Sequence, residues 1–83
     1  MQAKYVKTDN VCCPYCKQKH PVDLMLREEI TRVKNRAVRH AAYYYFCSEA
    51  GAEFETHGMY LDNEARAYEA WAAGERLGRS LGR

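Results

Sequence analysis

The sequence predicts a small α+β domain, and three features of the chain lead to this fold class. Two cysteines flank a proline turn at Cys13–Cys16, the aromatic run Tyr43–Phe46 is typical of a β-strand, and the stretch 64–77 is rich in alanine, a strong helix former. The chain has 83 residues, and alanine and tyrosine supply much of its 47% hydrophobic fraction. Because a chain this short buries a smaller share of its surface than a large protein does, we expect one domain, residues 1–83, that needs stabilisation by a disulfide, a metal ion or oligomerisation.

The first half of the chain predicts strands and turns. Residues 1–10 form a short lead-in strand or a loose end, and residues 11–21 form the cysteine turn. Between 22 and 40 two periodicities compete, because some apolar residues alternate as in a strand and others recur at helical spacing. Lys34-Asn35 is a favourable turn, since asparagine tolerates positive φ. We therefore expect a β-hairpin whose second strand runs through 38–46.

Two helices are expected in the second half. Ser48 is a good N-cap for a short helix over 49–56, and three glutamates in or near its early turns favour the helix dipole. A second start signal at Asp62-Asn63-Glu64 precedes a longer C-terminal helix within 62–78, whose far end is weakened by two glycines. The apolar stripe of this second helix consists of Ala67, Tyr68, Trp71 and Ala72.

The cysteines indicate a metal site more than a disulfide framework. No N-terminal segment has the regions of a secretory signal, and no stretch approaches the ~20 apolar residues of a membrane span. We therefore expect a cytoplasmic protein, in which thiols stay reduced. The tight turn allows the sulfurs of Cys13 and Cys16 to bind the same small ion, and Cys47 at the end of the aromatic strand can supply a third sulfur. Three thiolates predict a zinc ion as the cofactor.

The segments around these cysteines resemble a known family. The chain has a Cys-x-x-Cys turn, an aromatic strand that reads Tyr44-Tyr45-Phe46-Cys47-Ser48, and the downstream pairs Phe54-Glu55 and Tyr60-Leu61. This pattern is similar to the YHS/TRASH/MYM group of small treble-clef-like zinc domains. The resemblance covers residues 11–61 and implies zinc ligation by Cys13, Cys16 and Cys47. Where the family usually has a fourth cysteine, this chain has Gly51.

Three residues are candidates for the fourth ligand, since structural zinc usually takes four protein ligands. We rank His20 first, because it lies four residues beyond Cys16 and can fold back onto the ion. His57 is second, because a continuous helix would place it ~15 Å from Cys47. Cys12 is third, because neighbouring residues in an extended chain point in opposite directions.

The same turn invites an enzymatic interpretation, which the rest of the chain does not support. Cys13-Pro14-Tyr15-Cys16 resembles the active-site tetrad of glutaredoxins, but Pro21 follows where that family continues into a helix. The proline that faces the thiols in that family has no counterpart here. The sequence has neither a glycine-rich phosphate loop nor a nucleophile elbow. We therefore expect a protein that is not an enzyme.

Charge is unevenly distributed along the chain. Residues 1–40 carry nine Lys/Arg against four Asp/Glu, whereas residues 41–83 carry four against seven. A stripe without any acidic residue lies in the first half and consists of Arg32, Lys34, Arg36 and Arg39. Such a stripe can contact the phosphates of a nucleic acid, or it can be an ordinary solvated face.

These features lead to two hypotheses for function. The first is a zinc-binding regulatory module that contacts nucleic acid, or its machinery, through the basic stripe. The second is a protein-interaction module, such as a small inhibitor or adaptor of phage or mobile-element type, which uses Tyr68 and Trp71 as anchors. Either module is a monomer or a homodimer. Metal sensing or delivery is implied only by the family resemblance.

Overall fold

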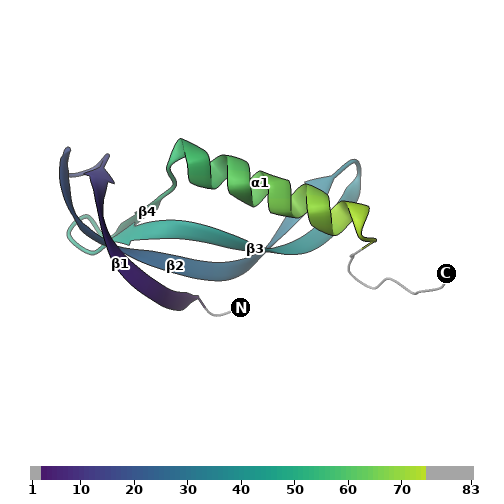
Figure 1. The fold of residues 1–83 in the computed structure, drawn as a ribbon, viewed down its shortest axis with the longest axis horizontal. Helices are drawn as coiled ribbons and strands as arrows, with labels where there is room; N and C mark the ends of the chain where they lie inside the picture. The colour runs from purple at the N-terminus through teal and green to yellow at the C-terminus, as the bar shows by residue number, and fades with distance from the viewer. Residues whose placement is uncertain (1–2, 75–83) are drawn as a thin grey trace.

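The computed structural model describes residues 3–74, which form an antiparallel four-stranded sheet and one helix (Figure 1). The strands are arranged in the order β1-β2-β3-β4. The elements are β1 (Lys4–Cys13), β2 (Gln18–Val33), β3 (Arg36–Cys47), β4 (Ala52–Phe54) and α1 (His57–Ala72). The α+β class predicted from the sequence is confirmed. Within residues 3–74, no helix is long and apolar enough to cross a membrane.

The long hairpin of β2 and β3 forms the centre of the sheet and confirms the hairpin prediction. Its two-residue turn is Lys34-Asn35, where φ is 50° and 68°. Positive φ at both central residues defines a type I′ turn, whose twist matches that of the flanking strands. The turn fixes the register, in which Val33 lies opposite Arg36 and Asp23 lies opposite Phe46.

The two faces of this hairpin have different neighbours. One face carries Val33 and Val38, which pack against Ala67 of α1, and we call it the helix-covered face. The opposite face is called the open face, because its residues near the hairpin turn, such as Ile30 and Arg32, are exposed. It carries the even-numbered residues 24–32 of β2 and the odd-numbered residues 37–45 of β3, because side chains alternate along a strand.

The helix begins one residue after Thr56, whose hydroxyl oxygen accepts a hydrogen bond from the Met59 backbone N–H at 3.1 Å. Its buried Asn63 then binds the edge of β3. The Asn63 amide accepts from the Tyr43 backbone N–H at 2.9 Å and donates to the Tyr43 carbonyl at 2.8 Å. One turn later Arg66 Nε donates to the Ala41 carbonyl at 3.1 Å. Side chains of α1 thus satisfy backbone groups of β3 beyond the point where β4 ends.

The prediction of a short helix over 49–56 is wrong. Residues 48–51 form a turn, and residues 52–54 form β4, which pairs with the end of β3. Pairing satisfies backbone groups at the open edge of β3, whereas a helix of two turns would leave that edge unpaired and most of its own terminal groups without intrahelical partners. The C-terminal helix is confirmed but begins at His57 rather than near 62. Residues 75–78 of its predicted span lie outside the described residues.

The core is divided between the two ends of an elongated molecule, which measures 50 × 22 × 17 Å. At one end Cys13, Val22 and Cys47 are buried, with Val11, Cys16, Tyr45 and Phe54 packed around them. At the other end Val33, Val38 and Ala67 are buried, with Ala70 and Trp71 packed around them. We call these regions the cysteine end and the helix end.

Candidate metal centre

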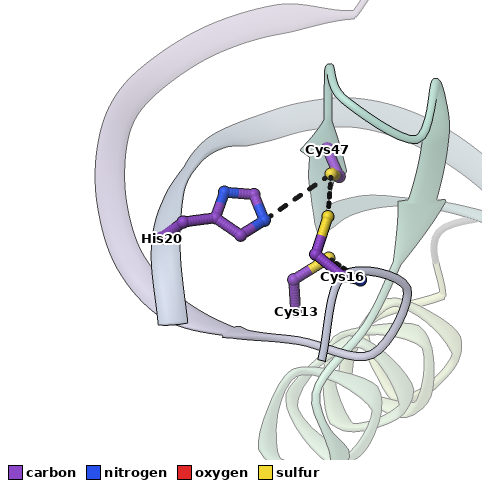
Figure 2. Close-up of side chains that lie close together, drawn as sticks. All are labelled: Cys13, Cys16, His20 and Cys47. Atoms are coloured by element: carbon purple, nitrogen blue, oxygen red, sulfur yellow. Dashed lines mark hydrogen bonds between the residues drawn. The ribbon is translucent and has the colours of Figure 1, made fainter. Parts of the chain in front are cut away.

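Four side chains at the cysteine end can hold a metal ion. The ligand atoms of Cys13, Cys16, His20 and Cys47 all lie within 4.8 Å of one another. Figure 2 shows the three sulfurs and the imidazole pointing toward a common centre. Two turns supply the sulfurs, one between β1 and β2 and the other between β3 and β4, and the histidine lies near the start of β2. The cluster therefore joins segments that are distant in the sequence.

The first turn, Cys13–Lys17, wraps its backbone around the Cys13 sulfur. The backbone N–H of Cys16 donates to Cys13 Sγ at 3.5 Å, and the backbone N–H of Lys17 donates to the Cys13 carbonyl at 2.8 Å. Lys17 then takes the left-handed conformation, with φ at 59°. Pro14 suits this turn, because its ring fixes φ near −65° and it has no N–H to leave unsatisfied.

The second turn, Cys47–Gly51, repeats this geometry around Cys47. The backbone N–H of Ala50 donates to Cys47 Sγ at 3.4 Å, and Gly51 has φ at 63°. Ala50 thus corresponds to Cys16 and Gly51 to Lys17. The glycine at the position where the resemblance puts a fourth cysteine therefore serves the backbone of the turn. A Cβ there would meet nothing within 4 Å, so the left-handed conformation is what favours glycine.

His20 is the fourth member of the cluster. Its Nδ1 donates to the Pro21 carbonyl at 2.9 Å, which leaves Nε2 unprotonated in the neutral ring, and Nε2 lies 3.8 Å from Cys47 Sγ. Such a bond to the second ring nitrogen orients a metal-binding histidine and fixes its tautomer. The other two candidates lie outside the cluster: Cys12 is exposed on β1, and His57 is the exposed first residue of α1.

Two of the spacings between ligand atoms are close to those of a tetrahedral zinc site. Zn–S bonds of 2.3 Å at the tetrahedral angle place two sulfurs about 3.8 Å apart, and a sulfur and a nitrogen about 3.6 Å apart. The Cys16 and Cys47 sulfurs are 3.7 Å apart, and Cys47 Sγ and His20 Nε2 are 3.8 Å apart. All three cysteines are free thiols. The remaining ligand atoms all lie within 4.8 Å of one another.

The thiols differ in how readily they ionise. Burial raises the pKa of Cys13, but hydrogen bonds from the backbone of Cys16, from His20 and from the backbone of Tyr15 outweigh burial and lower it to about 6. Burial, together with hydrogen bonds and charge from the other two sulfurs, raises the pKa of Cys16 to about 12. The hydrogen bond to Cys13 raises the pKa of His20. The site therefore favours ionisation of Cys13 over ionisation of Cys16.

Apolar and aromatic contacts bring the two turns together around the cluster. Tyr15 of the first turn donates its hydroxyl to the Glu53 carbonyl of β4 at 2.7 Å. Its ring meets Phe54 edge to face, with the centroids 6.1 Å apart. Phe54 also packs on Tyr45, whose hydroxyl donates to Asp9 at 3.2 Å. These contacts shield one side of the sulfurs from water.

The structure divides the basic stripe between two surfaces. The Lys34 ammonium and the Arg36 guanidinium lie 4.7 and 5.1 Å from the centre of the Trp71 ring, and Arg36 also donates to the Trp71 carbonyl at 2.8 Å. On the open face, Arg39 is paired with Glu28 at 3.6 Å, and Arg32 is exposed. The stripe is therefore not one continuous surface.

The two predicted partner anchors differ in exposure. Tyr68 is exposed on α1, whereas Trp71 is half-buried and packs at the helix end. The sequence prediction missed Asn63 and the backbone donors to the sulfurs. Gly51, four residues after Cys47, is a sequence signal for one of these turns, because glycine favours the left-handed conformation.

Comparison with known proteins adds no relative to this description. No protein-family model, curated protein or solved structure matches the chain significantly. The resemblance to small zinc domains therefore remains a prediction from its residues, and the functional argument depends on the geometry of the cluster.

Proposed function

We propose that this chain is a small zinc-binding module that binds a partner and does not catalyse a reaction. The observation that carries the proposal is the convergence of three thiols and one imidazole at the cysteine end. Three thiolates and one imidazole form a ligand set that is typical of structural zinc sites.

The composition of the cluster supports a structural role for the ion. A tetrahedral zinc ion bound by Cys13, Cys16, His20 and Cys47 has no open position for water or substrate. A catalytic zinc site usually has three protein ligands and keeps its fourth position open. The ion would cross-link the turn between β1 and β2 to the turn between β3 and β4, and so fasten both edges of the sheet.

The size of the core explains why such a cross-link matters. Among residues 3–74, the buried core of the cysteine end consists of Cys13, Val22 and Cys47, and two of these are proposed ligands. Structural zinc binds small domains with ~10–16 kcal/mol at neutral pH, and this free energy becomes folding free energy where the unfolded chain does not hold the ion. The ion would therefore contribute more stability at this end than apolar burial does.

Native mass spectrometry of the purified chain tests the proposal. We expect one zinc ion per chain, reduced thiols, and loss of the ion from Cys13→Ser, Cys47→Ser and His20→Ala variants. Cys12→Ser and His57→Ala are matched controls that should retain the ion, because neither residue belongs to the cluster. A metal-free chain with a disulfide between Cys13 and Cys16 would contradict the proposal and favour redox chemistry. Loss of zinc in the His57 variant would contradict the ligand set.

Nucleic acid is the first candidate for the partner. The placement of cations on the open face supports it, since Lys4 and Arg39 line a shallow cavity of about 420 Å³ there and Arg32 is exposed on the same face. We expect salt-sensitive binding to short DNA or RNA by fluorescence anisotropy. An Arg32→Ala/Arg39→Ala variant should lower the salt slope by about one unit per lost phosphate contact. Lys34→Ala is the matched control, and an unchanged slope in the double variant would exclude this surface.

A further inference from the structure

We propose that two copies of this chain pair along the free edge of β2, with residues 27–33 antiparallel to the same residues of the second copy and the two-fold axis at Ile30. This inference concerns the half of the hairpin that lies away from the metal cluster. It does not depend on zinc or on nucleic acid.

The edge is open because β1 covers only part of β2. The last pair between the two strands joins Lys4 to Leu26, and no strand within residues 3–74 pairs with residues 27–33 from the β1 side. In Figure 1, β2 and β3 continue past the beginning of β1 toward the hairpin turn. An uncovered edge presents unpaired backbone N–H and C=O groups, which are a template for another strand.

The register of the hairpin shows which residues present those groups. Val33 and Arg36 flank the two-residue turn and therefore form a hydrogen-bonded pair. Since bonded and non-bonded residues alternate along an antiparallel pair, Val33, Thr31 and Glu29 direct their backbone groups to β3. The residues between them direct their backbone groups outward. Three such outward-pointing residues lie in the open segment: Glu28, Ile30 and Arg32.

These three residues are complementary to themselves in an antiparallel pair. With the two-fold axis at Ile30, the two isoleucines lie opposite each other, and Glu28 of each copy lies opposite Arg32 of the other. Ile30 leaves 59% of its surface exposed. Opposite charges and apolar side chains that face each other across two strands both stabilise the pairing.

The other possible registers lack this complementarity. Because outward-pointing residues must face outward-pointing residues, the register changes in steps of two. A step in one direction places Glu28 opposite Ile30, and a step in the other direction places Arg32 opposite Ile30. Both steps separate the two isoleucines. The sequence of the edge therefore favours one register.

The charges already on the open face agree with this pairing. Arg32 has no ion-pair partner within residues 3–74, and Glu28 is held by Arg39 at 3.6 Å. In the paired state each Glu28 carboxylate would lie between Arg39 of its own chain and Arg32 of the other copy. Alternation of opposite charges across the junction supplies the charge complementarity that identifies the occupant as a second copy of this chain.

Part of the opposite edge of the sheet is closed to the same kind of pairing. There β4 pairs with β3 from Tyr45 to Cys47, and the Asn63 amide occupies both backbone groups of Tyr43. No strand within residues 3–74 pairs with the outer edge of β1, but this edge carries Lys4 and Lys7, and lysines on an edge strand discourage pairing.

A charge-reversal series tests the pairing and its register. Sedimentation equilibrium should show a reversible dimer of the zinc-loaded chain. Arg32→Glu and Glu28→Arg should each weaken it about tenfold, because each places two pairs of like charges opposite each other. The double variant, Glu28→Arg/Arg32→Glu, should recover most of the affinity, since it restores opposite charges in this register only. Circular dichroism and the zinc content show that each variant is folded.

A cross-linking experiment tests the position of the axis independently. Residues in a hydrogen-bonded antiparallel pair have Cα atoms about 5.5 Å apart, within the range that a disulfide spans. Ile30→Cys in a Cys12→Ser background should therefore form a covalent dimer under mild oxidation. Tyr5→Cys is the matched control, because Tyr5 is also 59% exposed and also lies on an edge strand.

The outcomes are decisive in both directions. A dimer that follows the charge-reversal pattern and cross-links at position 30, but not at position 5, supports the proposal. A chain that stays monomeric up to about 1 mM overturns it, because that range covers even weak association. A dimer that ignores both charge reversals, or that cross-links equally at position 5, overturns it as well, because the contact then lies elsewhere.

Discussion

The cysteine end and the helix end of the same hairpin are stabilised by different means. At the cysteine end two tight turns bring three thiols and an imidazole together, and Val22 is the only aliphatic residue among the three buried there. At the helix end α1 covers Val33 and Val38 with Ala67 and Trp71. The first end is built to bind an ion, whereas the second buries apolar surface. A short chain can stabilise a molecule that is 50 Å long by closing each end separately.

The largest expected effect concerns the cysteine end. Replacing Cys47 by serine should lower the free energy of unfolding of the zinc-loaded protein by several kcal/mol, since it removes a ligand at the centre of the cluster. Chemical denaturation followed by circular dichroism measures this loss. Cys12→Ser is the control and should leave stability unchanged. Equal stability of the Cys47 variant would mean that the ion, if bound, contributes little.

The next effect concerns the helix end. Trp71→Ala should cost about 3 kcal/mol, because it removes a large ring that packs on the core and interacts with two cations. The same variant should still bind one zinc ion per chain. Loss of zinc along with the stability would show that the two ends fold as one unit and would break the comparison.

A smaller effect is expected where the helix meets the edge of β3. Asn63→Ala should cost about 2 kcal/mol, because it leaves the backbone N–H and C=O of Tyr43 without their partners. Asn63→Asp keeps the acceptor for the Tyr43 N–H and loses only the donor for the Tyr43 C=O. It should be less destabilising at acidic pH, because the protonated carboxyl group again has a donor. Hydrogen exchange at Tyr43 would report the loss directly. Unchanged protection there would contradict this role of Asn63.

The smallest effect separates backbone conformation from metal ligation. Gly51→Ala should cost about 1 kcal/mol, since alanine adopts a left-handed conformation with difficulty. Zinc stoichiometry should not change, because Gly51 contributes no ligand atom. Gly58→Ala, inside α1 with equally open space around the added Cβ, should be neutral or slightly stabilising. Loss of zinc in the Gly51 variant would mean that the turn cannot form without glycine.

Sequence patterns predicted the parts of the fold that depend on local chemistry. The hairpin followed from Lys34-Asn35 and the strand character of the aromatic run, and His20 was ranked first from its short distance to Cys16 along the chain. The failures involved competition between local and long-range structure. Ser48 and the glutamates after it favour a helix, but the open edge of β3 binds residues 52–54 as a strand. The basic stripe is split because α1 places Trp71 beside Lys34 and Arg36, and no local sequence pattern predicts this long-range contact.

Hydrogen exchange measured with and without a zinc chelator tests the central claim, that a metal ion holds the cysteine end while burial holds the helix end. The account predicts that chelation removes protection from residues 13–17 and 47–54, and leaves it at 33–38 and in the second half of α1. Equal protection with and without chelator would contradict a structural ion at Cys13, Cys16, His20 and Cys47. Loss of protection along the whole chain would contradict the independence of the two ends.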